Sequence, residues 1–142
     1  MIDPDVAFNH GVAHRLSLAL ATLVVGQTLT SESDVPFEPF TAAFDRRTTV
    51  TAATLTAALD LGPDRDIVIS PATRFFERVA ESTDDPGTQQ VFAVLEHVMR
   101  RSLSGLKQVF VRGDGVVEVP FLLFGRLAGG PLVGLRSIAI ET

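Results

Sequence analysis

Two histidines near the beginning of the sequence have a spacing that suits metal binding. His10 and His14 are four residues apart, and on a helix this spacing can place both imidazoles on one metal ion. A third ligand is not evident, because nothing in the sequence brings Asp3 or Asp5 to the same face. A solvated helix face explains the pair better than a metal site, and an enzyme or metal protein built on these histidines is the alternative.

Other patterns that could carry catalysis are incomplete. No serine has the sequence context of a nucleophile elbow, so nothing anchors a catalytic triad. The glycines in residues 113–115 and 125–134 match neither a phosphate-binding loop nor a dinucleotide-binding pattern. Asp60, Asp64 and Asp66 lack calcium-loop spacing, and the chain has no cysteine. We therefore expect a protein that is not an enzyme and has no cofactor or intrinsic metal.

Two short polar segments, far apart in the sequence, are the strongest candidates for a binding surface. They consist of Ser31, Glu32, Ser33, Asp34, Glu141 and Thr142. By composition alone, residues 31–34 would be an ordinary polar loop or helix cap. The last two residues, however, directly follow the apolar, strand-like residues 132–140. A free carboxylate at the end of a buried strand would be an anionic probe.

Size and composition indicate one globular domain. Of the 142 residues, 46% are hydrophobic and 20% charged, so residues 1–142 are expected to fold around a single core. Twelve basic and seventeen acidic residues give a net charge of −5. An acidic protein is disfavoured as a nonspecific nucleic-acid binder and favoured as the partner of a basic protein. We expect no direct contact with nucleic acid.

The sequence predicts neither a membrane span nor a secretory signal. The longest apolar run, residues 18–25, is interrupted by Thr22 and is far shorter than the roughly 20 residues that cross a bilayer. Asp3 and Asp5 precede this run and no small-residue cleavage site follows it, which disfavours a signal peptide. The absence of cysteine is compatible with a reducing compartment, and we expect a cytoplasmic protein.

The elements that must position these residues begin with two predicted helices. The first has apolar residues at helical spacing, namely Val12, Leu16, Ala19, Leu20 and Leu23. His10, His14 and Ser17 fall on another face, and Gly26 is expected to end the helix. A second helix is expected over residues 51–60, before the Gly-Pro pair that follows.

Two residue pairs with proline predict where the next helices begin. Ser70 is predicted as the N-cap of a third helix, with Pro71 at its first position. Its buried side is expected to contain Phe75, Phe76 and Val79. Asp85 and Pro86 repeat this arrangement at the start of a longer fourth helix.

The remaining segments are predicted to be strands. Residues 37–44 are rich in phenylalanine but contain Pro39, which suits an edge strand, and residues 67–69 form a short apolar run. Three further strands, joined by glycine-containing turns, are expected as a consecutive antiparallel meander over residues 107–112, 116–124 and 132–140. Both alternating faces of the last strand are largely apolar, so helices should cover the sheet on both sides.

The order and spacing of several motifs resemble one known family. Residues 31–40, Ser-Glu-Ser-Asp-Val-Pro-Phe-Glu-Pro-Phe, resemble the Ser-Glu-Ser-acid-aromatic-Pro-Phe-Glu block of the inhibitors of the sugar-nonspecific nuclease A. Residues 132–142 are similar to that family's Glu-Thr terminus, residues 67–79 to its strand and Phe-Phe helix, and residues 116–119 to its Gly-Glu-Val-Glu strand. The resemblance covers nearly the whole chain. It implies an α+β fold, a three-layer α/β/α sandwich with a largely antiparallel central sheet.

The resemblance also implies a function. Members of that family plug the active site of a magnesium-dependent DNA/RNA endonuclease of the ββα-metal type. Glu32 matches the family's interface glutamate, and Thr142 matches the terminal residue that approaches the metal of the partner. The hypothesis that this protein is an inhibitor requires residues 31–34 and 141–142 to lie at the same end of the sandwich. The alternative is a protein-binding module of the same fold with a different basic partner.

The chain departs from the family's pattern in three respects. Val35 stands where the family has an aromatic residue before the proline, and the chain contains neither tryptophan nor tyrosine. Residues 45–66 do not follow the family's pattern closely. Tryptophan and tyrosine commonly anchor protein interfaces, so the identity of the target depends on other contacts.

Overall fold

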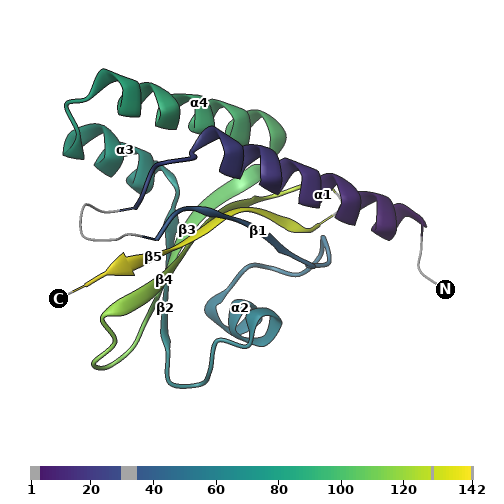
Figure 1. The fold of residues 1–142 in the computed structure, drawn as a ribbon. Helices are drawn as coiled ribbons and strands as arrows, with labels where there is room; N and C mark the ends of the chain where they lie inside the picture. The colour runs from purple at the N-terminus through teal and green to yellow at the C-terminus, as the bar shows by residue number, and fades with distance from the viewer. Residues whose placement is uncertain (1–3, 30–34, 129, 142) are drawn as a thin grey trace.

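The computed structural model describes residues 4–29, 35–128 and 130–141, with side chains described from Asn9 onward (Figure 1). In chain order the elements are α1 (Pro4–Leu23), β1 (Glu38–Ala42), α2 (Ala52–Leu59), β2 (Asp66–Pro71), α3 (Thr73–Ser82), α4 (Pro86–Ser102), β3 (Ser104–Arg112), β4 (Glu118–Arg126) and β5 (Leu132–Ile140). None of the helices in these ranges is long and apolar enough to cross a membrane.

The five strands form one sheet in the order β1-β5-β4-β3-β2, and every neighbouring pair is antiparallel. The predicted meander is therefore confirmed as β3, β4 and β5. β1 lies at one edge, where Glu38 is opposite Arg136 of β5. An edge position tolerates Pro39, because proline has no N–H to donate to a second neighbouring strand.

Helices cover both faces of the sheet, as Figure 1 shows: α1, α3 and α4 lie on one side and α2 on the other. Alternate residues of β4 pack into the cores on the two opposite faces of the sheet. Phe121 and Leu123 belong to the core beneath the three helices, whereas Leu122 and Phe124 belong to the core beneath α2. The expected α/β/α sandwich is confirmed.

Capping residues explain the bounds of α2 and α4. The hydroxyl of Thr51 accepts a hydrogen bond from the Thr54 N–H at 3.1 Å, and the Thr54 hydroxyl accepts one from the Thr51 N–H at 2.8 Å, which forms a capping box. Asp85 caps α4 by accepting from the N–H of Thr88 at 3.0 Å, with Pro86 in the first turn. Both predicted helix starts are confirmed.

The predicted start of α3 is wrong. Ser70 and Pro71 end β2, opposite Gln108 and Lys107 of β3, and the helix begins at Thr73 without a side-chain cap. The hydroxyl of Ser70 accepts a hydrogen bond from Gln108 Nε2 at 2.8 Å, so a contact across the sheet replaces the expected cap. Phe75 and Phe76 are buried as predicted.

The buried face of α1 also differs from the prediction. Its buried residues from Asn9 onward are Ala13, Ser17 and Leu20, and Val24 continues the same stripe beyond the helix. Ala19 and Leu23 are exposed instead. Ser17 fits a buried position because its hydroxyl donates to the carbonyl oxygen of His14 at 2.7 Å, which satisfies the polar group within the helix.

Candidate functional site

Five of the predicted binding residues lie outside the described residues: Ser31, Glu32, Ser33, Asp34 and Thr142. Their described neighbours nevertheless meet in space. Thr28 and Pro36, on either side of residues 30–34, form an antiparallel bridge. The Ser137 hydroxyl of β5 donates a hydrogen bond to the carbonyl oxygen of Val35 at 3.2 Å. The described residues that flank the segment are thus bridged to each other, and Val35 is hydrogen-bonded to β5 at Ser137.

Glu141, the remaining predicted residue, is tied to the β3–β4 hairpin. Its N–H donates to the carbonyl oxygen of Val117 at 2.9 Å. Its carboxylate accepts from Arg112 Nε, at 2.8 Å for Oε1 and 3.2 Å for Oε2. The guanidinium of Arg112 in turn lies over the ring of Phe110, 4.7 Å from its centroid. One backbone and one side-chain contact therefore fix the residue that precedes Thr142.

A second arginine lies next to this ion pair. The guanidinium of Arg78 is 5.4 Å from the centroid of the same Phe110 ring, and its Nη2 donates to Gln108 Oε1 at 3.3 Å. Partial desolvation, followed by the positive charge of Arg112, lowers the pKa of Arg78, and the carboxylate of Glu141 opposes the shift. Arg78 nonetheless stays cationic at neutral pH. Among the described residues, two cations thus share one carboxylate here.

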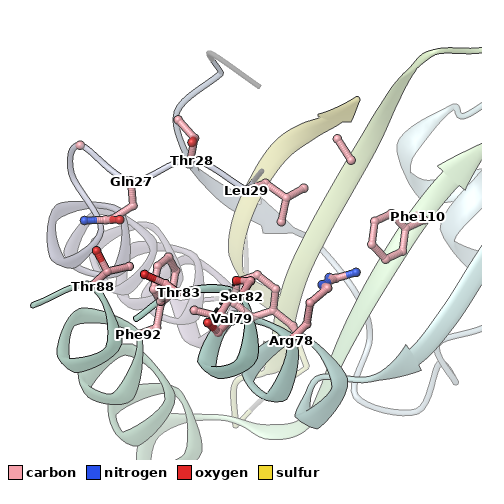
Figure 2. Close-up of a pocket in the computed structure, with 13 residues that line it drawn as sticks. Gln27, Thr28, Leu29, Arg78, Val79, Ser82, Thr83, Thr88, Phe92 and Phe110 are labelled. Carbon is pink, nitrogen blue, oxygen red and sulfur yellow. Dashed lines mark hydrogen bonds between the residues drawn. The ribbon is translucent and has the colours of Figure 1, made fainter. Parts of the chain in front are cut away.

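A cleft of about 440 Å³ opens beside these residues. It lies between the stretch that follows α1, the last turns of α3, the first turn of α4 and the sheet, as Figure 2 shows. Phe75, Phe92 and Phe110 supply apolar walls, and the side chain of Arg78 points toward Phe110. Ala139 of β5 also lines the cleft, so the cleft adjoins both segments of interest.

Charges are separated between the two ends of the sheet. By the strand registers, β1, β2 and β4 begin at the end where β3 and β5 finish, and the α3–α4 turn lies on the same side (Figure 1). We call this the acidic end; its described carboxylates are those of Glu38, Asp64, Asp66, Glu81, Asp84, Asp85, Asp114, Glu118 and Glu141. The described cations there are Arg65, Arg78, Arg112 and Arg136.

The opposite end is basic. The described cations at or near the chain reversals there are Arg46, Arg47, Arg74, Arg100, Arg101, Lys107 and Arg126, and the described carboxylates close to them in sequence are those of Asp45, Glu77 and Glu96. The molecule therefore has an uneven charge distribution, with one acidic and one basic end. The acidic end contains the described neighbours of both predicted binding segments. Such a distribution steers an approaching basic surface toward the acidic end.

The histidine pair lies apart from this arrangement. His10 and His14 are both exposed on α1. Over the part of the chain that the structure describes, no three His, Asp or Glu side chains are grouped so as to hold a metal ion.

The sequence did not identify Arg78 or Arg112 as site residues. Arg112 had a detectable signal, because the predicted meander puts the end of β3 and the end of β5 at the same end of the sheet. Arg78 had none, since its position depends on how α3 packs over Phe110. The cleft likewise depends on contacts among four separate parts of the chain.

Comparison with known proteins agrees with this fold. No curated protein matches the sequence. A family model described as nuclease A inhibitor-like protein matches residues 14–142, which is nearly the whole chain. The chain belongs to the nuclease A inhibitor-like family.

Proposed function

We propose that this protein inhibits a magnesium-dependent, sugar-nonspecific endonuclease of the ββα-metal type by covering its active site with the acidic end. Glu32, with Ser31, Ser33 and Asp34 beside it, forms one part of the binding surface, and Thr142 forms the other. The observation that carries the proposal is the hydrogen bond between Ser137 and Val35. It holds Val35, the residue that follows the polar segment, against the strand that precedes Glu141 and Thr142.

Charge complementarity provides the physical reason for binding. A nuclease that cleaves both DNA and RNA has a basic groove and a divalent ion for the scissile phosphate. Carboxylates that approach such a groove replace the negative charge of the phosphates but contain no bond that the enzyme can cleave. The carboxylates of the acidic end also raise the rate of encounter with a basic partner.

Glu141 has a different role in this proposal from that of Glu32. Because its carboxylate is engaged by Arg112 at 2.8 Å, it holds the end of the chain in place. Thr142, the next residue, is the one that we propose approaches the metal ion of the nuclease. The charge of Glu141 adds to the field of the acidic end without a direct contact being needed.

The test is titration of a ββα-metal nuclease with the wild-type protein, with Glu32→Ala and with a truncation that removes Thr142. We expect inhibition by the wild type at micromolar concentration or below. Each variant should weaken it by about 10- to 100-fold, the effect of losing a central interface residue. Glu77→Ala is the matched control, since Glu77 is exposed on α3 and outside both segments.

Two results would contradict the proposal. The first is the absence of inhibition by the wild-type protein against nucleases of this type encoded in the same genome. The second is equal inhibition by all the variants. Capture of a basic protein that is not a nuclease, in a complex unaffected by removal of Thr142, would instead support the alternative binding module.

A further inference from the structure

A groove of about 410 Å³ lies at the end of the sheet opposite the acidic end. Four cationic side chains line it, those of Arg46, Arg47, Lys107 and Arg126. We call it the basic groove. Arg46 and Arg47 belong to the turn between β1 and α2. The groove is separate from the proposed nuclease-binding surface.

A turn and an arginine build one wall of the basic groove. The N–H of Thr48 donates to the carbonyl oxygen of Asp45 at 2.9 Å, and Asp45 Oδ1 accepts from the N–H of Arg47 at 2.7 Å. Arg126 of β4 holds this turn, because its Nη1 donates to the carbonyl oxygen of Asp45 at 2.8 Å and its Nη2 to that of Thr48. The turn thus presents two adjacent arginine side chains from a fixed backbone.

An irregularity in β3 builds the other wall. The register between β3 and β4 shifts between Ser104 and Lys107, and Gly105 has a φ of +58°, a conformation that glycine adopts without strain. Beyond this irregularity Lys107 pairs with Phe124, and its half-buried side chain lines the groove. Lys107 therefore lines the same groove as Arg46 and Arg47 of the turn.

Among the described residues, none of the four cations of the basic groove is in an ion pair, and the carboxylate of Asp45 in the same turn offsets only part of their charge. The three ion pairs among the described residues use Arg100, Arg112 and Arg136. The side chains of Arg46, Arg47 and Lys107 take part in none of them. Converging cations repel one another, and this repulsion is relieved when an anion binds between them.

We propose that the basic groove binds a small phosphate-bearing anion, such as pyrophosphate or a 5′-mononucleotide. The volume falls within the roughly 300–1,000 Å³ of small-molecule sites. Arginine donates in a planar fork that matches phosphate oxygens, and lysine adds a compact charge. The groove does not depend on the proposed inhibition of a nuclease, so either proposal can fail without the other.

The test is calorimetric titration of the whole protein with inorganic pyrophosphate and, separately, with a 5′-mononucleotide, at roughly physiological salt. We expect the wild type to bind at least one of them. Arg46→Gln combined with Arg47→Gln should weaken binding by about tenfold or more, because two charge-assisted contacts are lost. Lys107→Gln should weaken it in the same direction. Thermal unfolding of each variant reports whether the fold is intact.

The matched control is Arg100→Gln combined with Arg101→Gln. It removes the same charge at the same end of the molecule, but neither residue lines the groove, so binding should stay as in the wild type. Equal weakening by the two double variants would mean diffuse attraction and would overturn the proposal. So would the absence of binding of both compounds at millimolar concentration. Tighter binding of the nucleotide than of pyrophosphate would add a base contact to phosphate recognition.

Discussion

Arg112 connects the end of the chain to the body of the sheet. It pairs with Glu141 and lies over Phe110, so the residue before Thr142 is held by a side chain from another strand. The side chains of Arg112 and Glu141 are 40% and 39% exposed. Because of this exposure to solvent, the ion pair contributes no more than about 1 kcal/mol to stability. In the proposed inhibitor its role is to hold Glu141, the residue before Thr142.

Arg112→Gln should therefore weaken nuclease inhibition more than it weakens the fold. We expect the free energy of unfolding in urea to change by at most about 1 kcal/mol, while inhibition falls by about tenfold because Glu141 is no longer held by a side chain. Arg100→Gln is the control, because it breaks the exposed Arg100–Glu96 pair on α4 at a distance from the chain end. Combining Arg112→Glu with Glu141→Arg should recover part of the inhibition. Full inhibition by Arg112→Gln would disprove the positioning role.

Gly134 is required by the close approach of β4. A Cβ at this position would lie 1.9 Å from the carbonyl oxygen of Leu123 and 2.6 Å from Cα of Phe124, and these backbone atoms cannot move without disturbing the sheet. Gly134→Ala should lower the free energy of unfolding by about 3 kcal/mol or prevent folding. Gly125→Ala meets mainly the side chains of Leu106 and Leu103 and should cost less. Urea unfolding of the two variants compares them directly.

At the scale of elements, the residue that caps α4, Asp85, is hydrogen-bonded to a residue that lines the cleft. Asp85 accepts from the hydroxyl and the N–H of Thr88, and Thr88 lines the cleft. These hydrogen bonds, the one from the hydroxyl first, lower the pKa of Asp85. A lowered pKa means that the contribution to stability is present above the ordinary pKa of aspartate and disappears as the pH falls through the folded value.

Asp85→Ala should accordingly lower the midpoint of thermal unfolding at neutral pH. The difference from the wild type should begin to shrink below about pH 4, the ordinary pKa of aspartate, and should disappear as the pH falls through the lowered pKa of the folded state. Asp84→Ala is the control, since Asp84 is the adjacent exposed carboxylate but does not cap the helix. A difference that stays constant down to pH values of about 2 would show that the charge of Asp85 does not matter.

The elements that the sequence predicts well are those with local signals. The start of α4 follows from Asp85 and Pro86, and the hairpins of the meander follow from glycine-containing turns. Ser70 and Pro71 carry an equally strong local signal but end a strand, because the contact of Ser70 with Gln108 comes from a neighbouring strand. The prediction of which face of α1 is buried was wrong for a related reason. Its residues are apolar on several sides, so packing against β1 and β5 decides which are buried.

At the scale of the whole molecule, the separation of charge depends on topology. Residues as distant in sequence as Glu38, Asp84 and Glu141 reach one end only because antiparallel strands return the chain there. The net charge of −5 follows from the composition, but the positions of the charged residues on the molecule follow from the fold. The same holds for the candidate site. Family motifs predict Glu32 and Thr142, and these two residues stay a prediction, whereas the positions of Arg78 and Arg112 depend on the packing of α3 and on the registers of the sheet.

This separation predicts how salt affects binding to a basic nuclease. Between about 0.1 M and 1 M salt the Debye length falls from about 10 Å to about 3 Å, so the association rate constant should fall by about tenfold or more. The dissociation rate constant should change less, because contacts within the complex are screened less than charges in solvent. Stopped-flow mixing at several salt concentrations measures both constants.

Variants that change the charge of one end test whether the acidic end is the source of the electrostatic attraction to the nuclease. Combining Asp84→Asn with Asp114→Asn removes two exposed charges from the acidic end and should slow association at low salt. Combining Glu77→Gln with Glu96→Gln removes the same charge from α3 and α4, away from that end, and should have a smaller effect. If both pairs slow association equally, net charge alone attracts the nuclease and the arrangement of charge by the fold has no role in steering.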